Sequence, residues 1–184
     1  MSLFDDPPFS LGQTLGVSSA SDGTGWVGAV KTFPDVNPRT GRVRSNRLKR
    51  CIAVRNVSTV AILPKKLVTF KNGSVSEVDG FNRLTDGVPA GVSDEYLPST
   101  GAAVNDVFWI TVDGPTEVSL GVANEAALGT TIVGLTAAAS TDSATAGRAQ
   151  TSANTLLIPG YVGVALSAGT TAQDILVNTK FVRS

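Results

Sequence analysis

The fold of this protein is decided by the stretch VNDVFWITVDGP at residues 104–115. From Val107 to Val112, apolar side chains fill most of both sets of alternating positions. Successive residues of a strand point to opposite faces, so a strand over this stretch is mostly apolar on both faces. Such a strand is typical of a central position that is covered on both sides.

The residues that follow predict a turn and then a second strand. Asp113-Gly114 is a common turn dipeptide, and Pro115 comes directly after it. Beyond the turn, residues 118–122 alternate between apolar and other side chains, as a half-buried strand does.

Short strands and turns of the same kind extend over the chain from Cys51 onward. Residues 67–75 contain Asn72-Gly73, a two-residue hairpin signal that places Phe70 opposite Val75. Further alternating stretches cover residues 162–166 and 174–181. Many short strands with glycine-rich turns predict a mainly β fold, either a small β-barrel or a sandwich.

One segment within this region is low in complexity. Residues 136–155 consist mainly of Ala, Ser and Thr. This composition fits a flexible loop and a weakly patterned pair of strands equally well.

The first 50 residues lack the pattern of the rest of the chain. Gly, Ser and Pro are frequent there, and four aromatic residues are widely spaced: Phe4, Phe9, Trp26 and Phe33. Such a segment is either a disordered tail or an arm that orders on the surface of a partner. Aromatic side chains are costly to leave in water, which favours the arm. We therefore expect a long extended N-terminal arm over residues 1–50 and a β-barrel-like domain over residues 51–184.

Charge is segregated along the chain, although the net charge is zero. Residues 39–71 contain ten basic residues and no acid, whereas residues 77–125 contain nine acids and one base. The basic segment is a solvated face, a strip that docks on an acidic partner, or a site for nucleic-acid phosphates. The absence of a basic excess over the whole chain, and of aromatic residues among these bases, argues against a nucleic-acid partner.

The residues needed for the commonest enzyme and metal chemistries are absent from the sequence. There is no histidine, and Cys51 is the single cysteine, so a histidine-based catalytic triad and a structural zinc site are both excluded. Cys51 is expected to be a buried, inert thiol. No phosphate-binding glycine motif occurs, and no apolar run is long enough to cross a membrane. We expect no enzyme activity, no cofactor, no metal, no membrane contact and, because no secretory signal is visible, synthesis in a cytoplasm.

Two regions of the chain resemble capsid decoration (cement) proteins of tailed bacteriophages. The first is GVPAGVSDEYLP at residues 87–98, followed by residues 104–115. The second is GYVGVALSAG at residues 160–169, followed by residues 175–177. The resemblance covers about residues 60–182 and leaves out the N-terminal arm. It implies a small β-barrel on the outer surface of the shell that clamps neighbouring major capsid subunits as a trimer or a dimer, with no catalytic residues.

Taken together, these features predict a structural virion protein that is made in the host cytoplasm. It is expected to bind the outer capsid surface and stabilise the shell by bridging neighbouring major capsid subunits, with a homotrimer favoured over a homodimer. The alternatives are a tail or fibre adaptor and, less favoured, a carbohydrate-binding module or a carboxylate enzyme. The capsid-binding residues are predicted in the arm and the basic segment: Phe4, Phe9, Trp26, Phe33, Arg39, Arg42, Arg44, Arg47, Lys49 and Arg50.

Overall fold

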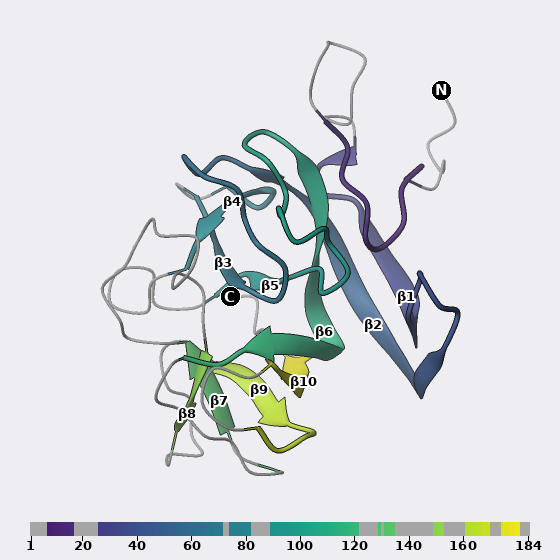
Figure 1. The fold of residues 1–184 in the computed structure, drawn as a ribbon. Coiled ribbons are helices and arrows are strands. Elements are labelled where there is room, and N and C mark those ends of the chain that lie inside the picture. The colour runs from purple at the N-terminus through teal and green to yellow at the C-terminus, as the bar shows by residue number, and fades with distance from the viewer. Residues whose placement is uncertain are drawn as a thin grey trace.

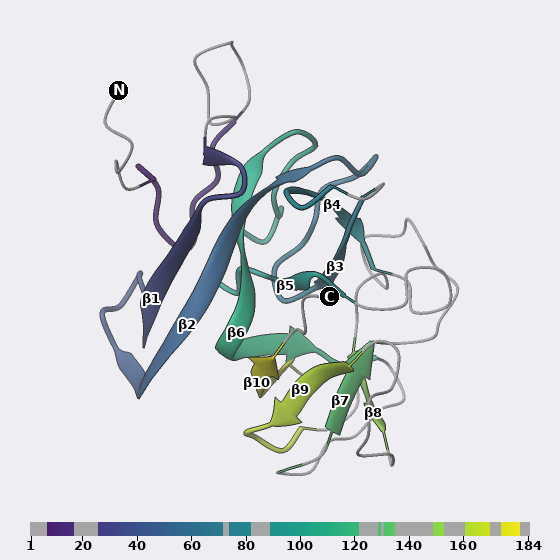
Figure 2. The same ribbon diagram turned by 180° about the vertical axis from the view of Figure 1, so that it is seen from behind.

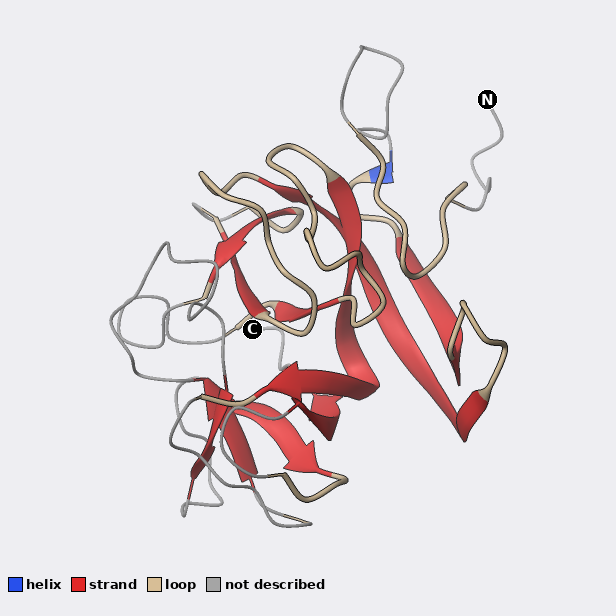
Figure 3. Cartoon of the chain, in the orientation of Figure 1, coloured by secondary structure: helices blue, strands red, loops and turns tan. Residues whose placement is uncertain are grey.

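The computed structural model describes residues 7–16, 26–71, 74–81, 89–121, 129, 131–134, 149–152, 161–169 and 174–180. Almost all regular structure within them is β-strand (Figures 1 and 3). The strands are β1 (Val30–Val36), β2 (Val43–Asn56), β3 (Leu67–Phe70), β4 (Glu77–Gly80), β5 (Gly91–Ser93), β6 (Val107–Ser119), β7 (Thr131–Gly134), β8 (Ala149–Ser152), β9 (Tyr161–Ala165) and β10 (Asp174–Lys180). Among the described residues, no helix is both long and apolar enough to cross a membrane.

Five of the strands pair in a ring. The order is β2-β4-β3-β5-β6, and β6 pairs again with β2, so the pairings return to their start. The β2–β4 contact is parallel and short, whereas the β2–β6 contact is antiparallel and long. The interior is filled by aliphatic and aromatic side chains from these strands and their loops, including Ile52, Val68, Phe108 and Ile110. This ring confirms the prediction of a mainly β fold built on a small barrel.

Strand β6 is the central strand that the sequence predicts. Phe108 and Ile110 point into the ring, and Val107 and Trp109 point out of it into a second apolar cluster. All four side chains are fully buried. The prediction of a central strand that is covered on both faces is therefore confirmed.

The turn predicted at Asp113-Gly114 is wrong. β6 continues through this dipeptide and bends, as Figure 1 shows. Before the bend β6 pairs with β2, and after it with β10. Gly114 has a φ of 100°, and a Cβ there would lie 2.4 Å from the carbonyl oxygen of Leu48. Glycine is thus required by a close strand crossing and not by a chain reversal.

The predicted hairpin register after β3 is also wrong. Phe70 lies opposite Val78 of β4, and not opposite Val75. The Lys71 N–H donates to the Glu77 carbonyl at 2.9 Å, so the connection is longer than the two residues expected. The Asn72-Gly73 pair itself lies outside the described residues.

The C-terminal half of β6 continues the same ten-stranded sheet into a part outside the ring, called the second sheet below. Its order is β6-β10-β9-β7-β8, and all of these neighbours are antiparallel. β9 and β10 confirm the strands predicted at residues 162–166 and 174–181. Within residues 136–155, the described part is β8. Val118, Leu120, Ile132 and other residues of this sheet pack with Leu67 and Val92 of the ring in one further cluster.

The chain does not divide between residues 50 and 51. Strand β2 crosses that position, and β1 pairs with it. Phe9 stacks on Trp109 with ring centroids 4.7 Å apart, and Phe33 meets the same indole edge-on at 5.2 Å. The indole N–H donates to the Phe9 carbonyl. Phe9 and Phe33 therefore cover the outer face of the barrel, because that face of β6 is apolar and needs a cover.

We predict that Gly114→Ala lowers the free energy of unfolding by about 2–4 kcal/mol, because left-handed strain and a backbone clash act together. Gly41→Ala is the matched control: Gly41 also has a positive φ, but a Cβ there would meet nothing within 4 Å. The control should lose about 1 kcal/mol from backbone strain alone. Denaturation in urea measures both losses, and equal losses would contradict the close approach at Gly114.

Candidate functional site

The feature that stands out from the barrel is the β1–β2 hairpin, called the ribbon below and comprising residues 30–50. Figures 1 and 2 show its turn projecting away from the ring. The turn is ordered by Asn37, whose Oδ1 accepts N–H bonds from Arg39 and Thr40. The Gly41 N–H donates to the Asn37 carbonyl at 2.8 Å. The ribbon is therefore a defined hairpin and not a loose arm.

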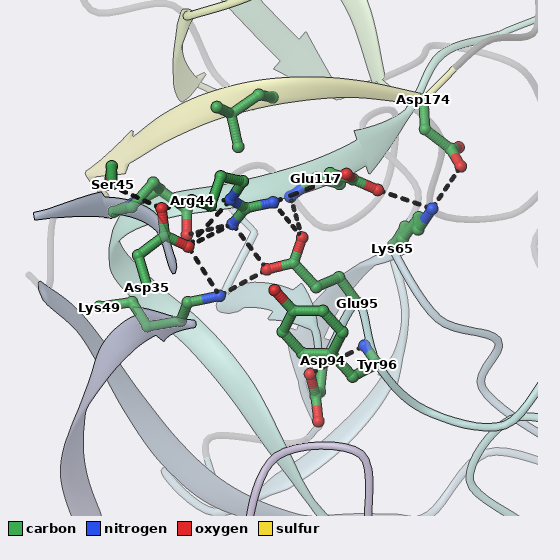
Figure 4. Close-up of polar contacts among 12 residues, drawn as sticks. Asp35, Arg44, Ser45, Lys49, Lys65, Asp94, Glu95, Tyr96, Glu117 and Asp174 are labelled. Atoms are coloured by element: carbon green, nitrogen blue, oxygen red, sulfur yellow. Dashed lines mark hydrogen bonds and ion pairs between the residues drawn. The ribbon is translucent and has the colours of Figure 1, made fainter. Parts of the chain in front are cut away.

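Beside the turn of the ribbon, Arg44 of β2 is held between two carboxylates (Figure 4). Its Nε and Nη2 donate to Asp35 of β1, the shortest contact being 2.7 Å. Its Nη1 and Nη2 donate to the two oxygens of Glu95, at 2.7 and 2.9 Å. Asp35 and Glu95 are buried, so this paired geometry supplies the hydrogen bonds that buried charges require.

A second cation, Lys49, completes the cluster from the same strand. Its side chain is only 1% exposed, and its Nζ donates to Glu95 and lies 3.7 Å from Asp35. The ammonium group also lies 5.1 Å from the centre of the Tyr96 ring. Two cations thus share two buried carboxylates, so each charge within the cluster has a counter-charge.

The ion cluster continues onto the second sheet. Glu117 of β6 lies 3.6 Å from Arg44 and 2.7 Å from Lys65. Lys65 in turn lies 2.7 Å from Asp174 of β10. The Glu117 backbone N–H donates to Glu95. The cluster therefore ties the ribbon to the loop after β5 and to both sheets.

The pairing changes the acidity of these groups. Burial by itself would raise the pKa of Asp35, but hydrogen bonds from Arg44 and Ser45 outweigh it and lower the pKa. At Asp174, burial is likewise outweighed by hydrogen bonds from Lys65 and Ser119, and the pKa is lowered. Both carboxylates therefore contribute stability above their unfolded pKa, and this contribution is lost as the pH falls through the folded value.

Asp94, next to Glu95, behaves in the opposite way. Burial raises its pKa to about 6, against the lowering effect of hydrogen bonds from the backbone N–H groups of Gly12 and Tyr96. The Gly12 bond ties the N-terminal segment to the loop after β5. Asp94 therefore holds the N-terminal segment around Gly12 in place with a carboxylate whose ionisation is opposed by burial.

The charge segregation seen in the sequence is largely satisfied within the chain. Arg44 and Lys49 of the basic segment pair with Glu95 of the acidic segment. Arg55 pairs with Glu77, and three further pairs follow the same pattern: Arg44–Glu117, Lys65–Glu117 and Lys71–Asp79. For these bases, the acidic partners are therefore residues of the same chain.

The predicted capsid-binding residues differ in their surroundings. Phe9, Phe33, Arg44 and Lys49 are structural, since the aromatics cover Trp109 and the cations belong to the ion cluster. Trp26 is half-buried beside the same apolar cluster. Four residues are exposed: Arg39, Arg42, Arg47 and Arg50. Phe4 lies outside the described residues.

The sequence reasoning missed the acids of the cluster: Asp35, Glu95, Glu117 and Asp174. The complementary charge of residues 39–71 and 77–125 could have indicated Glu95 and Glu117, whereas Asp35 and Asp174 lie outside both ranges. Cys51 is buried as predicted, near the Thr111 hydroxyl, and burial raises the pKa of its thiol to about 12. Within the described ranges, no three His, Cys, Asp or Glu residues are grouped to hold a metal ion.

No protein family model matches the sequence, and no curated protein matches it. Among solved structures, the fold is similar to the N base of the head fibre gp8.5 of bacteriophage phi29. The TM-score is 0.44 at 11% sequence identity, over 73% of this chain and 98% of that chain. It is also similar to a chain of the capsid of Myoviridae phage XM1, with a TM-score of 0.49 at 19% identity, over 77% of this chain and 90% of that chain. Both structures are of phage head components.

We predict that Lys49→Met lowers the free energy of unfolding by about 3–5 kcal/mol, because it leaves buried carboxylate charge without its cation. Arg50→Met is the matched control, since it removes the same charge at the next residue from an exposed position. The control should change stability by less than about 0.5 kcal/mol. Guanidinium denaturation measures both; an equally mild effect of Lys49→Met would show that the cluster does not stabilise the fold.

We also predict that Asp94→Asn changes the pH dependence of stability. Because the folded pKa is raised, the folded wild type binds a proton more tightly than the unfolded chain, and it loses that advantage as the pH rises from about 4 to 6. The stability of the variant relative to the wild type should therefore rise by on the order of 2–3 kcal/mol between pH 4 and 7. Thermal or urea unfolding across this range measures the difference, and parallel profiles would contradict it.

Proposed function

We propose that this chain is a structural component of a phage virion. It binds the outer surface of the capsid and stabilises the shell by bridging neighbouring major capsid subunits. The observation that carries the proposal is the ribbon: it extends beyond the ring, and the ion cluster beside its turn holds it to the loop after β5 and to Glu117 of β6. A binding element that is already rigid loses little conformational freedom when its partner docks.

The resemblance to decoration proteins supports the same proposal. Its first region, residues 87–98 and 104–115, contains β5 and most of the ring half of β6. Its second region contains β9 and part of β10. The resemblance therefore falls on strands of the ring and of the second sheet, with β6 shared by both.

We propose further that the chain is not an enzyme. The carboxylates of the ion cluster are engaged by cations and by N–H or O–H donors: Asp35 by Arg44 and Ser45, and Glu95 by Arg44 and Lys49. A general base must instead have a lone pair within reach of a substrate proton. These charges are arranged to fix strands relative to one another.

Bridging also requires more than one contact per assembly. We propose that the chain forms a homo-oligomer, a trimer before a dimer, so that several ribbons engage one shell. Linked weak contacts raise overall avidity without any single strong site.

We predict that the purified chain has an oligomeric mass by light scattering and pellets with undecorated phage shells to a saturating stoichiometry. Gold-labelled protein should cover the shell in electron micrographs. Label confined to a vertex or a tail would instead assign the chain as a tail or fibre adaptor. Protein that stays in the supernatant at every concentration would refute capsid binding, and a monomeric mass would refute the oligomer.

A further inference from the structure

We infer that one face of the ribbon is the docking surface, and that the partner presents an acidic protein surface with aliphatic groups on either side of the acid. The outer ribbon face consists of Val30, Thr32, Pro34, Leu48 and Arg50. This inference rests on the proposed function for the identity of the partner as a capsid subunit. The chemistry of the surface itself comes from the fold.

The strand register places these residues together. Val30 lies opposite Ile52, Thr32 opposite Arg50, and Pro34 opposite Leu48, and directly opposed residues share one face of a strand pair. Along β2, Ile52 is buried in the ring interior. The face that is interior at Ile52 thus continues beyond the ring into solvent.

The opposite face of the ribbon is fully used by the protein itself. Phe33 lies against Trp109, Asp35 and Lys49 belong to the ion cluster, and Cys51 is buried in the apolar cluster around Trp109. The two faces therefore have different roles: the inner face fixes the ribbon, and the outer face remains open.

Aliphatic side chains on the ribbon are strongly exposed. Leu48 is 63% exposed, Val43 is 59% exposed and Val30 is 48% exposed. Together they are three of the seven large hydrophobic side chains that are exposed in the described part of the chain. Scattered exposed aliphatics need no explanation, but their concentration on a rigid projecting element marks an interaction surface.

The exposed charge of the ribbon has a single sign. Four arginines are exposed: Arg39, Arg42, Arg47 and Arg50. The only acid of the ribbon, Asp35, is buried and paired with Arg44. The nearest acid by register is the exposed Asp113, opposite Arg50, which leaves a positive excess. Opposite charge on the partner follows from electrostatic complementarity, and arginine is enriched at protein interfaces.

A protein surface fits this face better than a nucleic acid does. Binding of single strands requires exposed aromatic side chains on which bases stack. The aromatic residue of the ribbon, Phe33, is buried on the inner face. Exposed Leu48 and Val30 gain nothing from phosphates, whereas they gain from burial against aliphatic groups.

The partner is expected to pack on the face of the ribbon and not to add a strand to its edge. β1 is the terminal strand of the sheet order, and an open edge invites strand addition. Pro34 lies within this edge strand and has no N–H to donate. Edge pairing with a second copy is therefore hindered, while the outer face stays accessible.

The test is co-sedimentation of the full chain with undecorated shells, using single variants of the outer ribbon face. Leu48→Ser and Arg50→Gln should each weaken binding at least tenfold, and binding of the wild type should weaken as salt is raised. The matched controls are Val104→Ser, at an exposed valine by the far end of β2, and Lys71→Gln, at an exposed base after β3. Both controls should bind within about twofold of the wild type, with melting temperatures unchanged in all four variants.

The outcomes separate the two proposals. Shells that bind the wild type and both ribbon variants equally would overturn this inference and leave the proposed function standing. A wild type that binds no shells would overturn both. Duplex DNA that competes with shells, and loses its own binding in Arg50→Gln but not in Leu48→Ser, would overturn the protein partner in favour of a phosphate-binding ribbon.

Discussion

The rest of the structure depends on the placement of Arg44 and Lys49 between Asp35 and Glu95. Taking these charges out of water is costly, and the cost is offset only while the carboxylates stay within hydrogen-bond reach. Three of the four residues come from the ribbon, and Glu95 comes from the loop after β5. The ribbon therefore has one well-defined position relative to the barrel, because any sliding of β1 against β2 would leave a buried charge without its partner.

The second constraint is that β6 serves two sheets and is buried on two faces. A strand can pair with β2 and then with β10 only if it bends, and Gly114 permits the bend because a side chain there would strike the Leu48 carbonyl. Its outward face then needs an apolar cover, which the segment around Phe9 provides. The N-terminal residues are thus part of the core that the central strand imposes.

The sequence predicts the parts of this fold that depend on local pattern. The alternation of residues 107–112, 162–166 and 174–181 was sufficient for β6, β9 and β10, because a strand buries its faces with period two. Alternation did not decide the structure at Asp113-Gly114, because the same dipeptide suits both a chain reversal and a bend within a continuous strand. The deciding contact comes from Leu48, far away in sequence. The spaced aromatics were interpreted as anchors on the surface of a partner, but Phe9 and Phe33 pack on Trp109 of the same chain, which local pattern does not specify.

The candidate site, like the fold, could be predicted from the sequence only in part. Segregated charge left open whether the bases of residues 39–71 form a solvated face, dock on an acidic partner or bind phosphates, and the structure pairs several of them with acids of the same chain. The register then divides the bases by position along β2: Lys49 points inward and is neutralised, whereas Arg50 points outward. A chain of zero net charge thereby presents a locally positive, partly aliphatic ribbon, because the one acid of the ribbon, Asp35, is buried and paired with Arg44. The ion cluster and the proposed docking surface therefore both follow from the way in which successive side chains of β2 point to opposite faces.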